Sequence, residues 1–418
     1  MLIVVMAERT ELRKAARNHV EDLRGASRLA VEATRGVTDL VEAMHHKIAS
    51  GPALLGRPLE VPVRAITGLV YGSVRRVTRL VGASIDFALA PLAPLLGEST
   101  PGFEREAVLA ALNGVLGDYL QATGNPLAIQ MWLRSGGRAL ELERQALRAA
   151  LPEAGGKLLV LVHGSCMCDL QWTRKGHDHG AALARDLGYT PVYLHYNSGL
   201  HISTNGRAFA GLLETLVEQW PVPLEELTIV AHSMGALVSR SACDTAATAG
   251  QRWLPKLKNL VCLGAPHHGA PFERGGNLVD VALGISAYSA PFARLGKIRS
   301  AGVTDMRHGN LRDEDWEGRD RFAYGNDRRR PMPLPEGVRC FAAAATKAKV
   351  EGGKPCSDGL VPVDSALGRH PRPELTLAFP REHQWVGLGM NHVDLLSRPE
   401  VFDVLKRWLS DGAAEKRA

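Results

Sequence analysis

The sequence has few cysteines, few aromatic residues and little excess of charge. Only 6 of its 418 residues are cysteine and 6% are aromatic, and 50 basic against 44 acidic side chains leave a net charge of +6. Six scattered cysteines exclude a disulfide framework, and their spacing matches no pair of C-x-x-C zinc ligands. The basic residues form no stripe with interleaved aromatic residues, so we expect no nucleic-acid partner.

Long apolar runs are also lacking. The first residues, MLIVVMAERTELRK, hold a short apolar stretch with no basic residue before it. This is unlike a secretory signal, and the stretch is too short to cross a bilayer, so we expect a cytoplasmic protein. Hydrophobic residues make up 45% and charged residues 22% of the chain, which is ordinary globular usage and excludes a wholly disordered chain.

Residues 1–150 have the pattern of a helical N-terminal region. Apolar side chains recur at helical spacing, and the pattern predicts helices at 10–50, from 66 onward, at 103–122 and at 136–149. The second of these runs into an apolar segment that Pro91 and Pro94 interrupt. Three roles remain open for this region, namely docking on the rest of the chain, self-association, and peripheral contact with a membrane or lipid surface. The sequence does not fix the oligomeric state.

Residues 151–418 have a different pattern, in which short apolar runs alternate with amphipathic helices. This alternation predicts a mostly parallel sheet with helices on both faces. Strands are expected at 157–162, 191–196, 227–231, 257–265, 338–345 and 374–379, and helices near 179–188, 205–219, 235–249 and 398–410. Residues 270–335 are rich in Gly, Arg and Asp and interrupt the alternation, so we expect an inserted cap there.

The strongest chemical signal is the segment LTIVAHSMGALVSRSA, residues 227–242. An apolar strand runs into Ser233 and a helix follows at once, which is the arrangement of a nucleophile elbow. The sharp turn needs small residues two before and two after the serine, and Ala231 and Gly235 meet that need. We therefore expect Ser233 to be the nucleophile.

A serine nucleophile needs a base, because its hydroxyl is barely ionised at neutral pH. Enzymes with a nucleophile elbow carry these residues along the chain in the order serine, acid, histidine, so we expect both partners downstream of Ser233. We favour His392, in a Gly-containing loop between the expected last strand and the closing helix, and His383 in the same loop is its rival. The other histidines after the elbow are His267, His268, His308 and His370, and the first two are expected to shape the rim of a pocket.

The acid is expected after the next-to-last strand, in the segment KPCSDGLVPVDSALG. Asp358 precedes a glycine in a turn that can direct its carboxylate at the base, whereas Asp364 has the position of a cap for a short helical turn. We favour Asp358, whose role would be to fix the imidazole tautomer and to stabilise the imidazolium.

An oxyanion hole is expected beside His163-Gly164, which follows the first strong strand. In this arrangement backbone amides bind the oxyanion, and we assign them to Ser165 and Met234. Three other groups give weaker functional signals, and we favour structural roles for them: His177-Asp178-His179, Cys166 with Cys168, and the run Arg328-Arg329-Arg330. For the loop from Tyr196 to His201, lining the acyl site and ordinary loop packing are equally open. We expect no metal site and no cofactor.

The segments VLVHG, AHSMG, LGAPHHGAP, SDGLVPVDSALG and GMNHVDLL together resemble the lipase and esterase branch of the α/β-hydrolases. They are similar in particular to bacterial proteins grouped with the glycosylphosphatidylinositol inositol-deacylase-like lipases, over residues 157–410. The resemblance implies an α/β-hydrolase domain over residues 151–418, with Ser233, Asp358 and His392 as its triad. Ala231 departs from the usual glycine of the elbow.

The expected function is a cofactor-independent hydrolase of carboxylic esters, with acyl-ester or lipid substrates and an acyl-enzyme intermediate. An acyltransferase or a thioesterase would use the same residues. A lipid-surface binding or scaffold protein on a degenerate hydrolase fold is the alternative from another class.

Overall fold

A computed structural model of the chain describes residues 103–269, 300–318, 327, 329–349 and 357–410, together with Arg24, Gly25 and Arg28. The chain separates into two compact units, Met1–Pro101 with Ala122–Ala128, and Gly102–Gln121 with Ile129–Ala418. In the first unit, Arg24, Gly25 and Arg28 are helical, while the rest of the helices expected at 10–50 and from 66 onward lies outside the described residues.

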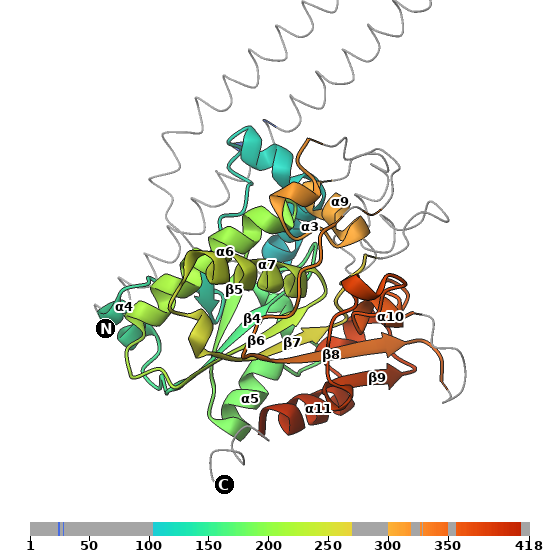
Figure 1. Cartoon of the computed structure of the whole chain (residues 1–418). Helices are drawn as coiled ribbons and strands as arrows, with labels where there is room; N and C mark the ends of the chain where they lie inside the picture. Colours follow the sequence, from blue (N-terminus) through green and yellow to red (C-terminus); the bar gives the residue numbers. More distant parts are fainter. Residues whose placement is uncertain are drawn as a thin grey trace, which may run out of the picture. The chain divides into compact units, whose positions relative to one another are not determined.

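The second unit is built on a sheet of eight strands in the order β3-β2-β5-β4-β6-β7-β8-β9 (Figure 1). The strands are β2 (Trp132–Ser135), β3 (Arg138–Ala139), β4 (Lys157–Val162), β5 (Thr190–His195), β6 (Glu226–His232), β7 (Leu257–Leu263), β8 (Arg339–Thr346) and β9 (Gln384–Leu388). The strands from β5 to β9 in this order are parallel, whereas β2 pairs antiparallel with both β5 and β3. All six parallel strands therefore end at the same edge of the sheet, here called the carboxyl edge.

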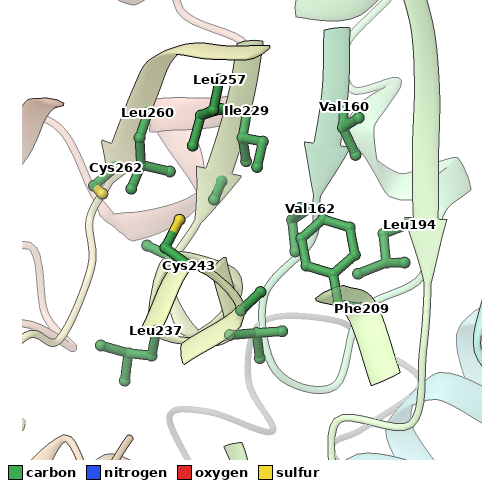
Figure 2. Close-up of a cluster of buried hydrophobic side chains, with 14 of the residues drawn as sticks. Val160, Val162, Leu194, Phe209, Ile229, Leu237, Cys243, Leu257, Leu260 and Cys262 are labelled. Carbon is green, nitrogen blue, oxygen red and sulfur yellow. The ribbon is translucent and has the colours of Figure 1, made fainter. Parts of the chain in front are cut away.

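Helices cover both faces of the sheet. One face packs on α6 (Ile202–Gln219) and α7 (Met234–Ala249), and the other on α5 (His179–Leu187) and α11 (Pro399–Ser410). Figure 2 shows the first of these interfaces, in which Phe209 of α6 and Leu237 and Cys243 of α7 lie against side chains of the central strands. Buried apolar residues on both sides explain why these strands read as continuous apolar runs.

The remaining elements lie around this core. They are the helices α3 (Phe103–Ala122), α4 (Arg144–Ala150), α9 (Ala301–His308) and α10 (Val363–Ala366), and the 3₁₀ turns η3 (Asp169–Trp172), η4 (Leu254–Lys256), η6 (Asp313–Asp315), η7 (Pro373–Leu375), η8 (Arg381–His383) and η9 (His392–Leu396). Parts of the expected cap at 270–335 lie outside the described residues, and its described part contains α9 and η6.

The sequence predicts most of this architecture correctly. The expected strands at 157–162, 191–196, 227–231, 257–265 and 338–345 match β4 to β8 within two residues at each end, and the four expected helices match α5, α6, α7 and α11 within three residues. The fold is an α/β-hydrolase fold. The expected helix at 103–122 is α3.

Two expected elements are wrong. Residues 374–379 form no strand, because prolines flank them and Leu377 donates its backbone N–H to Gly368 O at 2.8 Å instead of to a strand. The last strand of the sheet is β9. The helix expected at 136–149 begins only at Arg144. Before it, Gly136 and Gly137 both have positive φ and close a β2–β3 hairpin, the turn chemistry that a Gly-Gly pair favours. The sheet thus includes strands upstream of the expected boundary at 150/151, which stays a prediction.

Among the described residues, no helix is long and apolar enough to span a membrane.

Candidate active site

Ser233 sits in a strained turn at the carboxyl edge of the sheet. It follows the end of β6 and is the N-cap residue of α7, with φ 53° and ψ −124°. A non-glycine residue in a sparsely populated region of this kind costs about 1–3 kcal/mol. The neighbouring strand holds the turn, because the N–H of Ser233 donates to Leu263 O at the end of β7 at 2.8 Å. A serine held in this way matches the nucleophile elbow expected from the sequence.

The neighbours of the turn are small because two loops meet there. A Cβ on Gly235 would lie 2.5 Å from the carbonyl oxygens of both Val162 and His163, and a Cβ on Gly164 would lie 3.0 Å from the Cβ of Ser233. The loop after β4 therefore packs directly on the elbow. This contact supplies the physical reason for the small residues that the motif requires.

Asp358 and His392 form a buried ion pair or hydrogen bond at the same edge. The His392 Nδ1 lies 2.7 Å from Asp358 Oδ2, and both side chains are almost fully buried. The other oxygen, Asp358 Oδ1, accepts the backbone N–H groups of Leu360 and Val361, both at 2.8 Å. The turn that the sequence favoured for the acid thus orients the carboxylate, and Asp358 fixes the Nδ1–H tautomer of His392.

The Asp358–His392 pair and Ser233 are brought to one edge by parallel strands of the same sheet. Ser233 follows β6, Asp358 comes after β8 and His392 comes after β9. Gly264, which follows β7, lies against the imidazole, since a Cβ there would be 3.1 Å from Cε1 and 3.2 Å from Nδ1 of His392. In addition, the His232 Nε2–H donates to the carbonyl oxygen of His392 at 3.2 Å, which ties η9 to the elbow.

The rival residues lie elsewhere. His383 contacts the carbonyl oxygen of Cys340 through Nδ1 at 3.1 Å, and Cys340 is at the start of β8, so this histidine lies at the opposite edge of the sheet. The side chain of Asp364 is 74% exposed and contacts Arg369. Neither arrangement brings these groups to the elbow.

The other candidate histidines also have structural partners. His308 ends α9, and His370 lies 3.7 Å from Asp327. His267 and His268 follow β7 and line a recess that is described below.

The two residues expected to be oxyanion donors, Ser165 and Met234, follow the ends of β4 and β6 at the carboxyl edge. Met234 is the first residue of α7, where backbone N–H groups have no partner within the helix. Ser165 is buried in the turn after β4 and precedes Cys166, which has a positive φ of 59°. This turn is held by Ser198, whose hydroxyl oxygen accepts the N–H of Cys166 at 3.0 Å.

Helix α3 also supports this turn, a role that the sequence did not indicate. A Cβ on Gly114 would lie 2.2 Å from Cys166 Sγ, so the helix backbone packs directly on the turn. Asn197 donates from Nδ2 to Gly117 O at 3.0 Å, and Tyr196 donates its hydroxyl to His163 O at 2.9 Å. The loop from Tyr196 onward therefore joins α3 to the turn that carries Ser165.

A buried polar cluster lies behind the same turn and was missed in the sequence. Glu106 of α3, Asp169 of η3 and His195 of β5 place one ligand-type atom each within 4.8 Å of one another. The guanidinium of Arg134 lies among them, with Nη1 at 2.7 Å from Glu106 and 3.1 Å from Asp169. A cation is thus already supplied by the chain. Burial alone would raise the pKa of Asp169, but the hydrogen bond from His195 and the charge of Arg134 hold it below its ordinary value.

The His177-Asp178-His179 segment begins α5, as the sequence favoured. Asp178 is the N-cap and accepts the N–H of Ala181 at 2.9 Å. His177 Nε2 contacts His179 Nδ1 at 2.9 Å, and His179 Nε2 lies 3.0 Å from the carbonyl oxygen of Leu395. These contacts link α5 to η9, the turn that contains His392.

Part of the chain matches a known protein family. The PGAP1-like alpha/beta domain family matches residues 207–339. No curated protein matches the chain. Among solved structures, Bacillus licheniformis lipase BlEst2 in its mature form is 17% identical and has a TM-score of 0.39, over 60% of this chain and 91% of that chain.

Two other solved structures are similar at lower TM-scores. Staphylococcus hyicus lipase is 12% identical with a TM-score of 0.36, over 63% of this chain and 98% of that chain. Phospholipase PlaB from Legionella pneumophila is 16% identical with a TM-score of 0.32, over 51% of this chain and 46% of that chain. Residues 207–339, which include the elbow, thus resemble the PGAP1-like alpha/beta domain, within an α/β-hydrolase fold.

Proposed function

We propose that the protein is a serine hydrolase that cleaves carboxylic esters of acyl or lipid substrates. The observation that carries the proposal is that a strained Ser233 and the buried Asp358–His392 pair lie at the same edge of the sheet. A serine hydroxyl is activated for acyl transfer when a base such as an imidazole, held by a carboxylate, accepts its proton.

In the proposed reaction Ser233 Oγ attacks the ester carbonyl carbon while His392 Nε2 accepts the hydroxyl proton. Asp358 accepts the Nδ1–H of His392 and stabilises the imidazolium without becoming protonated. The backbone amides of Ser165 and Met234 bind the tetrahedral oxyanion, and each such donor is worth about 3 kcal/mol of barrier. The imidazolium then protonates the leaving alcohol, and water cleaves the acyl-enzyme by the same steps.

Covalent labelling with a fluorophosphonate tests the nucleophile. Wild-type protein is expected to label at the peptide that contains Ser233 and to hydrolyse p-nitrophenyl butyrate, and Ser233→Ala to do neither while keeping its unfolding transition. Ser410→Ala is the matched control, because Ser410 lies on the last helix and bonds only Lys406 O in the described structure. Equal labelling of wild type and Ser233→Ala at one peptide would refute the assignment.

We further propose a cytoplasmic location with peripheral contact to a lipid surface through the N-terminal region. The five described cysteines are all free thiols, which suits a reducing compartment. The apolar segment at 80–97 follows a cluster of three arginines, Arg75, Arg76 and Arg79, a composition suited to an anionic lipid surface.

Vesicle flotation tests the lipid contact. The full chain is expected to float with vesicles that contain phosphatidylglycerol, and a chain that starts at residue 102 is expected not to float. The shorter chain keeps α3 and the whole sheet. A chain that starts at residue 152 is expected to aggregate, because it lacks β2, β3 and the helix that packs on Cys166. Flotation of the chain from residue 102 as efficient as that of the full chain would contradict the proposed role of the N-terminal region.

A further inference from the structure

A small polar recess is lined by residues of α7, of the loop after β7, of η6 and of η7. Its cavity volume is about 20 Å³, and about 300 Å³ of empty space is present when the open mouth is included. Arginine and histidine side chains dominate its polar lining, which comprises Arg240, Arg329, Arg330, His267, His268 and a single carboxylate, Asp315. The excess of cationic groups gives the recess a positive character.

Arg240 is the central feature of this recess, because it is a buried cation that no carboxylate pairs with in the described structure. Only 4% of the residue is exposed. Its Nη2 donates to the carbonyl oxygen of Met332 at 2.6 Å and its Nη1 lies 3.4 Å from His267 Nδ1, while its Nε has no partner among the described residues. A buried charge is costly unless it is paired, so a guanidinium in this state is suited to an anionic partner.

The histidines of the recess have unused polar atoms as well. His267 Nε2 and His268 Nδ1 are buried without a hydrogen-bond partner among the described residues. Burial lowers the pKa of His267 well below its ordinary value and that of His268 to about 4, so both rings are neutral at pH 7. A neutral imidazole has a single N–H group. His267 Nδ1 faces the N–H of Arg240 Nη1, so the proton of His267 is on Nε2 and can be donated to an oxyanion without adding charge. The Nε2–H of His268 already donates to Gly368 O at 2.9 Å, so its Nδ1 can only accept a hydrogen bond.

The nearby acidic groups are already engaged. Asp315 Oδ2 accepts the backbone N–H groups of Leu311 and Arg312 at 2.9 and 3.1 Å. Asp327 pairs with Arg329, whose Nη2 lies 2.9 Å from it. Burial lowers the pKa of Arg240 to about 10, which still leaves the guanidinium charged at neutral pH. The cations of Arg240 and of the exposed Arg330 thus remain for a ligand.

The recess is close to the elbow along the chain. Arg240 lies on α7, the helix whose N-cap is Ser233, and seven residues at 1.5 Å per residue place the two about 10 Å apart along the helix axis. His267 follows Gly264, which contacts His392, by three residues. The recess is thus about 10 Å from Ser233 along α7.

We infer that the recess binds a tetrahedral oxyanion of the phosphate type, supplied either by the headgroup of a phospholipid or as free phosphate. Guanidinium groups match the oxygens of phosphate in geometry and charge, and such charge-assisted hydrogen bonds are among the stronger ones in proteins. Binding of free phosphate does not depend on ester hydrolysis, whereas the headgroup assignment rests on the function proposed above.

Isothermal titration of full-length Ser233→Ala protein with inorganic phosphate tests the site without turnover, with chloride at equal ionic strength as the reference. We expect saturable phosphate binding, its loss in Arg240→Gln and a weakening of about tenfold in Arg330→Gln, each made in the Ser233→Ala background. Arg330→Gln keeps the test valid if the buried Arg240 variant does not fold, because Arg330 is exposed.

The matched control is Arg381→Gln in the same background, since Arg381 is also exposed but belongs to η8, which precedes β9 at the opposite edge of the sheet. It is expected to leave phosphate binding unchanged. Absence of saturable binding, or binding that Arg330→Gln and Arg381→Gln affect equally, would overturn the inference.

A second measurement separates the two sources of phosphate. In the protein with Ser233 intact, the ratio of kcat/KM for short-chain phosphatidic acid to kcat/KM for diacylglycerol of the same chain length is compared between wild type and Arg330→Gln. A fall of about tenfold in this ratio assigns the recess to a lipid headgroup, and an unchanged ratio with phosphate binding retained in the titration assigns it to free phosphate. If neither ester is cleaved while phosphate still binds, the proposed function fails and the anion site stands.

Discussion

Gly264 offers a way to displace the imidazole of His392 without touching it. The glycine has φ 61°, and an added Cβ would lie 3.1 Å from Cε1 of His392 and 2.8 Å from Cδ1 of Leu395. Both distances are shorter than relaxed carbon–carbon contacts, so the imidazole and Leu395 must shift. The substitution Gly264→Ala therefore perturbs the proposed base through packing alone.

The expected effect has two parts. A non-glycine residue in the left-handed region costs about 1–2 kcal/mol, which lowers the free energy of unfolding by that amount. A shift of a fraction of an ångström also disturbs the 2.7 Å contact between His392 Nδ1 and Asp358. Because a misplacement of about 1 Å can cost about 100-fold in rate, we expect kcat to fall about 10- to 100-fold with little change in KM.

Gly250→Ala is the matched control for backbone strain. Gly250 has φ 62° in the left-handed C-cap of α7, and nothing lies within 4 Å of a Cβ built there. This variant is expected to lose a similar free energy of unfolding, about 1–2 kcal/mol, and to keep the wild-type kcat.

Urea unfolding and p-nitrophenyl butyrate hydrolysis measure both parts on the same samples. If Gly264→Ala and Gly250→Ala have equal kcat at equal stability, the imidazole next to Gly264 is not the catalytic base, and the assignment of His392 is refuted.

Three further predictions concern the proposed acid, two buried histidines and metal ions. Asp358→Asn should lower kcat by about 10⁴-fold or less, whereas the exposed Asp364→Asn should leave it unchanged; the reverse order in folded protein would refute the choice of acid. Burial lowers the pKa of His163 to about 3 and of His179 to about 4. Below about pH 6.5 the unfolded chain binds protons at these two histidines, whereas the folded chain does not. The free energy of unfolding should therefore fall as the pH is lowered from 6.5 to 4, by up to about 1.4 kcal/mol per pH unit for each histidine. Denaturant titrations at pH 7.5, 6 and 5 measure this slope, and a flat profile would contradict the prediction. EDTA should leave ester turnover unchanged, since the proposed steps use only groups of the chain; loss of activity that zinc or calcium restores would show a metal requirement.

Local patterns gave the proposed nucleophile but only part of its surroundings. Ser233 could be predicted because the strand, the turn and the helix that position it are consecutive in the sequence. The contact between Asp358 and His392 depends on the order of β8 and β9 in the sheet, which only a correct last strand would supply. The mistaken strand at 374–379 placed His383 and His392 in one loop, whereas the structure separates them by β9.

Groups assembled from distant elements left no comparable signal. Glu106, Arg134, Asp169 and His195 come from a helix, a strand, a turn and another strand, so no spacing connects them. Arg240 did leave a trace, because it interrupts a run of small and apolar residues on α7, LVSRSAC, whose other members are buried. A charge on the buried side of the helix that follows a nucleophile is a pattern that sequence analysis can use.

The backbone of Ser233 has a consequence for evolution and engineering. At φ 53° glycine would relieve the local strain, so at this position the residue that the proposed chemistry needs is not the one that folding prefers. Replacing Ser233 with glycine should make the protein more heat-resistant while abolishing ester hydrolysis. Selection for thermal stability alone would therefore drive this chain toward an inactive form, and only simultaneous selection for turnover would retain the serine.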